Sequence, residues 1–157
     1  MFYTQVLKFP RLPDHLVQKA LDSIRDYEVQ DEFEKTGNYR WHLLDPQVQE
    51  WLNTNVLEGA WGIQTNTDDK DLDVHVDRFT PTRILYTLDP GGPNVTTTFY
   101  ENDRKTVIES IVLQPHTWYA LKTDIYHAAH GIVPGQTRIA ITVRFFTNHE
   151  PKPLKPR

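Results

Sequence analysis

The sequence contains no cysteine among its 157 residues. This excludes disulfide bonds, thiol nucleophiles, iron–sulfur clusters and cysteine-ligated zinc, so any bound metal ion has to use His, Asp or Glu side chains. The sequence also lacks an apolar run long enough to span a bilayer, and its first ten residues lack the basic-then-apolar pattern of a secretion signal. We therefore expect a cytoplasmic protein with no membrane partner.

Positive charge is scarce and dispersed. The chain has 17 Lys and Arg against 21 Asp and Glu, which gives a formal net charge of -4. No basic run of the kind that follows a phosphate backbone is present, so we expect no nucleic-acid partner. Hydrophobic residues make up 38% and charged residues 24% of the chain, a composition typical of a globular domain with a sizeable core.

The first third of the chain has helical periodicity. After a short predicted strand, apolar residues recur at helical spacing near residues 14–27, and a second helix is expected near 45–54. Asp14 and Asp45 are the expected N-caps, and Pro46 suits the first turn of the second helix. The segment between the two helices is expected to be a polar loop.

From about residue 58 the pattern changes to short alternating runs separated by turn signals, which predict about eight strands up to residue 147. We expect one domain over 1–147, with a β core at about 58–147 and an extended tail over 148–157. This order predicts a mainly β fold, an antiparallel barrel or sandwich with N-terminal helices against one sheet.

The last predicted strand has one apolar face, formed by Ile139, Ile141 and Val143, and a mixed face formed by Arg138, Ala140 and Thr142. One interpretation is a sheet with one solvated face. The other is a barrel whose apolar outer face lies under the helices and whose mouth is polar. Alternation by itself favours the first interpretation, which is common among antiparallel sheets.

The stretch "LDVHVDRF", residues 72–79, is predicted as a strand with Asp73, His75 and Asp77 on one face. Alternate residues on a strand point the same way with Cα atoms roughly 7 Å apart, so His75 and Asp77 can converge on one ion. Two histidines and one carboxylate on one side of an ion leave its other positions open, as in non-haem Fe(II) oxygenases. A second histidine has to come from elsewhere.

Candidates for it occur in "HAAHGIVPGQTRIAITVRF", which places His127 and His130 on one arm of a predicted hairpin and Arg138 at the start of the returning arm. A guanidinium group can hold a carboxylate through two parallel hydrogen bonds. An arginine beside the metal could therefore bind the far end of a dicarboxylate that chelates the ion with its other end.

Together these motifs resemble the 2-oxoglutarate/Fe(II)-dependent oxygenases over residues 72–146. "GGPNVTTTFYE" is similar to a stretch of the prolyl 4-hydroxylase-like enzymes, and "LKTDIYHAA" is similar to the asparaginyl hydroxylase-type and phage-encoded branches. The resemblance implies a double-stranded β-helix (jelly-roll) barrel that acts as a hydroxylase. It also implies Fe(II), 2-oxoglutarate as co-substrate, O₂, ascorbate as a supporting reductant, and succinate and CO₂ as co-products.

The resemblance implies that His75, Asp77 and His127 bind the metal and that Arg138 binds 2-oxoglutarate. His130 is the alternative third ligand, because "HGIVP" resembles the H-x-V-x-P of the prolyl hydroxylases, whereas the eleven-residue interval to Arg138 favours His127. Hairpin parity depends on loop length. A two-residue turn puts His127 on the face of Arg138, and a three-residue loop puts His130 there.

One residue on the strand after the HVD motif is expected to hydrogen-bond the co-substrate. Tyr86 is the first candidate and Thr87 the alternative, because only one of two neighbours can face inward. Four further histidines are expected to be solvated: His15, His42, His116 and His149.

The substrate expected from the small size of the chain is a peptide or protein side chain rather than a free small molecule. Two alternatives remain open. A cupin-like metal-binding domain would share the barrel but usually carries an H-x-H motif with a glutamate, which this sequence lacks. A non-catalytic jelly-roll interaction module would carry the HVD motif by accident.

Overall fold

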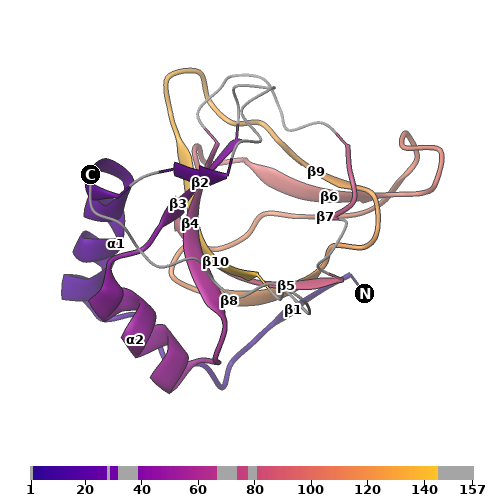
Figure 1. The fold of residues 1–157 in the computed structure, drawn as a ribbon. Helices are drawn as coiled ribbons and strands as arrows, with labels where there is room; N and C mark the ends of the chain where they lie inside the picture. Colours follow the sequence, from indigo (N-terminus) through magenta and orange to yellow (C-terminus); the bar gives the residue numbers. More distant parts are fainter. Residues whose placement is uncertain (1, 28, 32–38, 67–73, 78–80, 145–157) are drawn as a thin grey trace.

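Figure 1 shows the computed structural model, which describes residues 2–27, 29–31, 39–66, 74–77 and 81–144. Its strands and helices, in chain order, are β1 (Tyr3–Gln5), α1 (Asp14–Asp26), β2 (Val29–Asp31), β3 (Tyr39–Leu43), α2 (Pro46–Asn55), β4 (Ala60–Asn66), β5 (Thr82–Asp89), β6 (Thr96–Tyr100), β7 (Val107–Ile111), β8 (Trp118–Lys122), β9 (His127–His130) and β10 (Arg138–Arg144). The predicted tail, 148–157, lies outside the described residues.

The fold is mainly β and is built from two antiparallel sheets. The larger sheet has the order β1-β8-β5-β10-β4-β3-β2, and the smaller has the order β7-β6-β9. Figure 1 shows the smaller sheet lying across from β10, β5 and β8, with the helices on the far side of the larger sheet. The arrangement is compatible with a β-sandwich. Over the described ranges, no helix is both long and apolar enough to cross a membrane.

The two faces of β10 enter two different cores. Ile141 and Val143 belong to the cluster that includes Leu16, Val48 and Leu52 of the helices. Ala140 belongs to the cluster between the sheets, with Leu85, Phe99, Tyr119 and Leu121. The apolar face of this strand therefore lies under the helices, as in the second interpretation of its alternation. Complete burial of each large aliphatic side chain there contributes about 1.5–3 kcal/mol.

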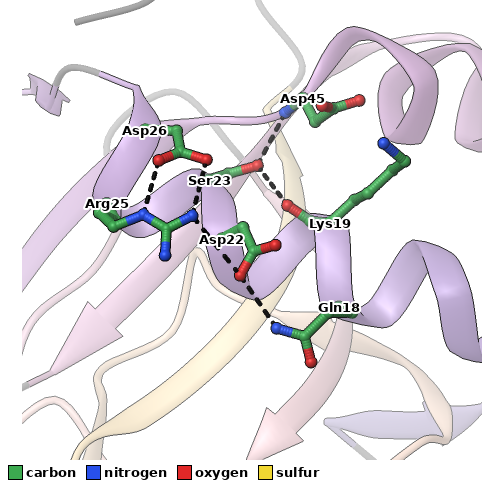
Figure 2. A network of polar contacts seen from close by, with 7 residues as sticks. All are labelled: Gln18, Lys19, Asp22, Ser23, Arg25, Asp26 and Asp45. Carbon is green, nitrogen blue, oxygen red and sulfur yellow. Dashed lines mark hydrogen bonds and ion pairs between the residues drawn. The ribbon is translucent and has the colours of Figure 1, made fainter.

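The two helices are joined through a buried serine. Ser23 of α1 donates its hydroxyl to the Lys19 carbonyl at 2.8 Å and accepts the backbone N–H of Asp45 at 2.9 Å, as Figure 2 shows. Asp45 in turn caps α2 by accepting the N–H of Gln47 at 2.8 Å, which confirms the predicted cap. The expected cap of α1 is wrong, because the N-cap is Pro13 and Asp14 already lies in the first turn.

The segment between the helices contains strands where a loop was expected. β3 pairs over its whole length with β4, from Tyr39↔Asn66 to Leu43↔Gly62. A Cβ atom on Gly62 would lie 2.0 Å from the ring of Trp41, so the absence of a side chain at this position lets the indole lie flat on β4. β3 therefore adds a strand to the larger sheet, between β4 and β2.

Two other predicted elements differ from the structure. The HVD segment is not a regular strand over its described residues, 74–77, and pairs with β9 only through an isolated bridge between His75 and His127. The expected hairpin of β9 and β10 is wrong, because β9 pairs with β6 in the smaller sheet and β10 pairs with β4 and β5 in the larger one. The loop-length argument for the third ligand therefore does not apply.

Candidate metal centre

Backbone hydrogen bonds bring the HVD segment against the start of β9. His75 and His127 exchange both backbone N–H···O bonds, at 3.0 and 2.9 Å, and the N–H of Asp77 donates to the Thr123 carbonyl at 2.9 Å. These three bonds hold 74–77 in an extended path without a full ladder. The side chains of residues 75 and 77 therefore converge as expected, although the strand that was expected to align them is reduced to one bridge.

Three side chains from these segments meet at one point: His75, Asp77 and His127. Their nearest ligand atoms all lie within 4.8 Å of one another. The Oδ1 atom of Asp77 is 3.4 Å from the Nε2 of His75 and 3.7 Å from the Nε2 of His127. Two imidazole nitrogens and one carboxylate oxygen thus face a common point, which is the donor set expected from the sequence.

The hydrogen bonding of His127 suits a metal ligand. Its Nδ1 lies 2.7 Å from the Ile125 carbonyl oxygen, which can only accept, so Nδ1 carries the proton. The Nε2 atom is then left with its lone pair, directed toward Asp77. A backbone carbonyl that fixes the ring in this way is the usual outer partner of a metal-binding histidine.

The protonation states of the site also suit a metal. Burial lowers the pKa of His127 to about 4, with the neighbouring His75 acting in the same direction, so the ring is neutral at pH 7. Burial by itself raises the pKa of Asp77, but hydrogen bonding from His75 and the positive charge of Arg83 outweigh it and hold the pKa below its usual value. The site therefore presents a neutral His127 and an ionised carboxylate, the forms in which these groups bind a metal.

His130, the alternative ligand, faces away from this point. On β9 it pairs with Thr96, whereas His127 pairs with Phe99, whose ring lies between the sheets. The two histidines are three positions apart, an odd number, so their side chains leave opposite faces of the strand. The His130 Nε2 forms a hydrogen bond with the hydroxyl of Tyr100. The structure thus brings His127, and not His130, to His75 and Asp77.

Arg138 is a buried cation at the first residue of β10, with 9% of its surface exposed. Its Nη2 donates to the Thr97 hydroxyl at 3.0 Å, and no ion pair of its guanidinium occurs among the described residues. Burial lowers its pKa to about 10. A buried charge with one neutral partner requires an anion to balance it.

Arg138 lies on β10 of the larger sheet and the candidate ligand His127 on β9 of the smaller sheet, and both side chains enter the space between the sheets. Thr97, which Arg138 contacts, pairs with Ala129 on β9, so it is the diagonal neighbour of His127 on the same face. Diagonal neighbours have Cα atoms about 7–8 Å apart. The partner of Arg138 therefore lies two residue pairs along the ladder from His127, a candidate metal ligand.

Tyr86 is not brought to this space. It pairs with Ile141 and belongs to the core under the helices, where burial raises the pKa of its hydroxyl. Thr87 pairs with Ala140, whose side chain faces the smaller sheet. Thr87 is 1% exposed, and its Oγ1 has no hydrogen-bond partner in the described part of the chain. The candidate that faces inward is Thr87, and the expectation for Tyr86 is corrected.

Two polar residues on this inner face were missed in the sequence. Arg83 of β5 forms an ion pair with Asp77, Nη2 to Oδ2 at 3.0 Å. Asn66 of β4 is directly opposite Arg138, is 2% exposed, and has a buried Nδ2 atom without a partner in the described ranges. Arg83 shares a face of β5 with Leu85, and Asn66 lies opposite Arg138, which shares a face of β10 with Ala140. This alternation was the available signal in the sequence, but it becomes usable only once the strand pairing is known.

The remaining histidines differ in burial. His15 is exposed and His116 half-buried, and His149 lies outside the described residues. His42 was expected to be solvated, which is wrong. It lies on β3, is 3% exposed, and its Nε2 is 3.3 Å from the Thr65 hydroxyl. The pairing of β3 with β4 buries it.

A surface groove of about 420 Å³ lies behind the segments that carry the ligands. Its walls include Val76, which lies between two ligands in the chain, and Ile125 and Tyr126 just before the third. Exposed apolar side chains border it, since Val76 is 37% and Ile108 41% exposed.

No protein-family model matches the chain, and no curated protein matches it.

Proposed function

We propose that the chain is an Fe(II)- and 2-oxoglutarate-dependent dioxygenase with a double-stranded β-helix (jelly-roll) fold. The observation that carries the proposal is the convergence of His75, Asp77 and His127 within 4.8 Å, across from a buried arginine that lacks a carboxylate partner in the described ranges. The two antiparallel sheets with helices on one outer face are compatible with this fold.

The donor set fits a ferrous ion, since it combines two imidazoles and one carboxylate on one side and leaves other positions free. When bound, the ion would supply the redox chemistry with O₂ that amino-acid side chains lack. Overall, 2-oxoglutarate is converted to succinate and CO₂ while a substrate C–H bond is hydroxylated.

The protein contributes binding and orientation. The guanidinium of Arg138 takes the distal carboxylate of 2-oxoglutarate in two parallel hydrogen bonds, and Thr97 holds the guanidinium in place. Thr87 and Asn66 present further polar atoms that lack partners among the described residues. The apolar residues between the sheets, Leu85 and Phe99 among them, limit access of water to this space.

The proposed substrate is a peptide or protein side chain rather than a free small molecule. The substrate C–H bond has to approach the side of the metal opposite its protein ligands.

The test measures succinate by NMR in a mixture of protein, Fe(II), 2-oxoglutarate, O₂ and ascorbate, against mixtures that each omit one component. Slow succinate formation that needs Fe(II), O₂ and 2-oxoglutarate together supports the proposal. His130→Ala, which leaves the three ligands in place, is the matched control for His127→Ala.

A second measurement covers an enzyme that is inactive without its substrate. Addition of 2-oxoglutarate to the Fe(II) protein under anaerobic conditions should produce a visible charge-transfer band, which requires only chelation of the metal. Absence of both succinate and the band would overturn the proposal. It would favour a cupin-like metal-binding domain if metal still binds, or a non-catalytic module if it does not.

A further inference from the structure

The two carboxylate oxygens of Asp77 face different partners. Oδ1 is directed toward His75 and His127, at 3.4 and 3.7 Å from their Nε2 atoms. Oδ2 lies 3.0 Å from the Nη2 of Arg83. One oxygen therefore faces the point where the histidines converge, and the other faces a fixed positive charge.

This ion pair is shielded from solvent, since the Arg83 side chain is 14% exposed and the Asp77 side chain 13%. The guanidinium is held from its other end as well, because Nη1 donates to Gln64 Oε1 at 3.1 Å. Gln64 is held in turn by its Nε2 donating to Asn66 Oδ1 at 3.3 Å. A guanidinium held at both of its terminal nitrogens has little freedom to leave Asp77.

We propose that Arg83 is a positioning residue that restricts Asp77 to one-oxygen coordination and so keeps an additional position on the metal open. The inference rests on the proposed metal centre. A carboxylate can bind a cation through one or both oxygens. The guanidinium of Arg83 engages Oδ2, and rotation of the carboxylate to bring Oδ2 onto the ion would break the pair.

The number of open positions decides what the site can bind. On a six-coordinate ion, two histidines and one carboxylate oxygen leave about three positions, enough for a chelating 2-oxo acid and O₂. If Asp77 bound through both oxygens, about two would remain, and the 2-oxo acid would fill them. With Arg83 in place, the metal can hold the 2-oxo acid and O₂ together. Without it, the metal can hold only the 2-oxo acid.

The test counts water molecules on Mn(II), a divalent stand-in for the ferrous ion, by pulsed electron–nuclear double resonance in the metal-loaded protein without 2-oxoglutarate. We expect about three waters in the unaltered protein and one fewer in Arg83→Met, because the freed Oδ2 replaces a water. Arg83→Lys, which keeps a cation able to reach Oδ2, should restore the third water. A residue with a purely structural role would change metal affinity without changing this count.

Arg138→Met is the matched control. It removes another buried arginine from the same inner face, but one that does not contact Asp77, so the count should stay at three. If Arg83→Met does not fold, Arg83→Gln provides the same test, since it keeps a polar group but is too short to hold Oδ2. Three waters in the folded Met or Gln variant would overturn the role of Arg83 alone. Failure of the unaltered protein to bind Mn(II) would overturn the metal centre itself.

Discussion

Arg138→Met should stabilise the metal-free and ligand-free protein. Burial lowers the pKa of the guanidinium to about 10, well below its usual value, and the difference is worth about 3 kcal/mol of unfavourable free energy for the charged form in the folded state. The substitution also removes the hydrogen bond to Thr97, which offsets about 1 kcal/mol of the gain. The net expectation is a rise of about 2 kcal/mol in the free energy of unfolding.

The sign follows from the linkage between charge and folding. The folded pKa is depressed, so the arginine destabilises the fold wherever it is charged in both states, which includes pH 7. The penalty would decline only as the pH rises above about 10, the pKa of the folded state. Urea unfolding at pH 7 should therefore show a higher midpoint for Arg138→Met with an unchanged slope.

Arg83→Met is the informative comparison, because its guanidinium is ion-paired and its loss leaves the largely buried Asp77 carboxylate without its arginine. It should lower the free energy of unfolding of the metal-free protein by roughly 3 kcal/mol. Two buried arginines of one face thus respond with opposite signs. An Arg138→Met variant less stable than the unaltered protein would refute the reasoning, since the guanidinium would then have a compensating partner and no need of an anion.

Three further predictions concern single contacts. His127→Ala should weaken Co(II) binding at least tenfold in anaerobic titrations, because it removes one of three candidate ligands, whereas His130→Ala should leave the affinity within about threefold. The reverse ranking would make His130 the ligand in place of His127. Gly62→Ala should lower the free energy of unfolding measured with urea by about 1–3 kcal/mol, since its methyl group would overlap the ring of Trp41, and an unchanged free energy would mean that the indole can shift freely. Ser23→Ala should cost about 1–2 kcal/mol in the same assay, because the backbone N–H of the α2 cap residue loses its acceptor, and a neutral result would show that water replaces the hydroxyl.

Local patterns in the sequence were sufficient for part of this structure. The alternation from Arg138 to Val143 predicts which side chains face the helices, because strand parity is a local property. The pair His75 and Asp77 was found in the same way. The third ligand required a choice that local parity could not make, since β9 and β10 belong to different sheets.

The failures share a cause in long-range pairing. Tyr86 and Thr87 differ by one position, and only the pairing of β5 with β10 shows which of them lies opposite an inward-facing residue. The five residues of β3 were read as a loop, because such a short segment becomes a strand only when β4 is available to pair with it.

The position of β10 between two cores has a consequence for how this protein can change over evolutionary time. Residues 141 and 143 contact the helix layer, whereas 138 and 140 face the smaller sheet, so the backbone of one strand separates the two sets of contacts. Substitutions distant from one another tend to act independently on stability. Substitutions in the helix layer can therefore change thermal stability while the residues that face the smaller sheet stay the same. Selection can then act on thermal stability and on the polar residues of the inner face through largely separate sets of positions.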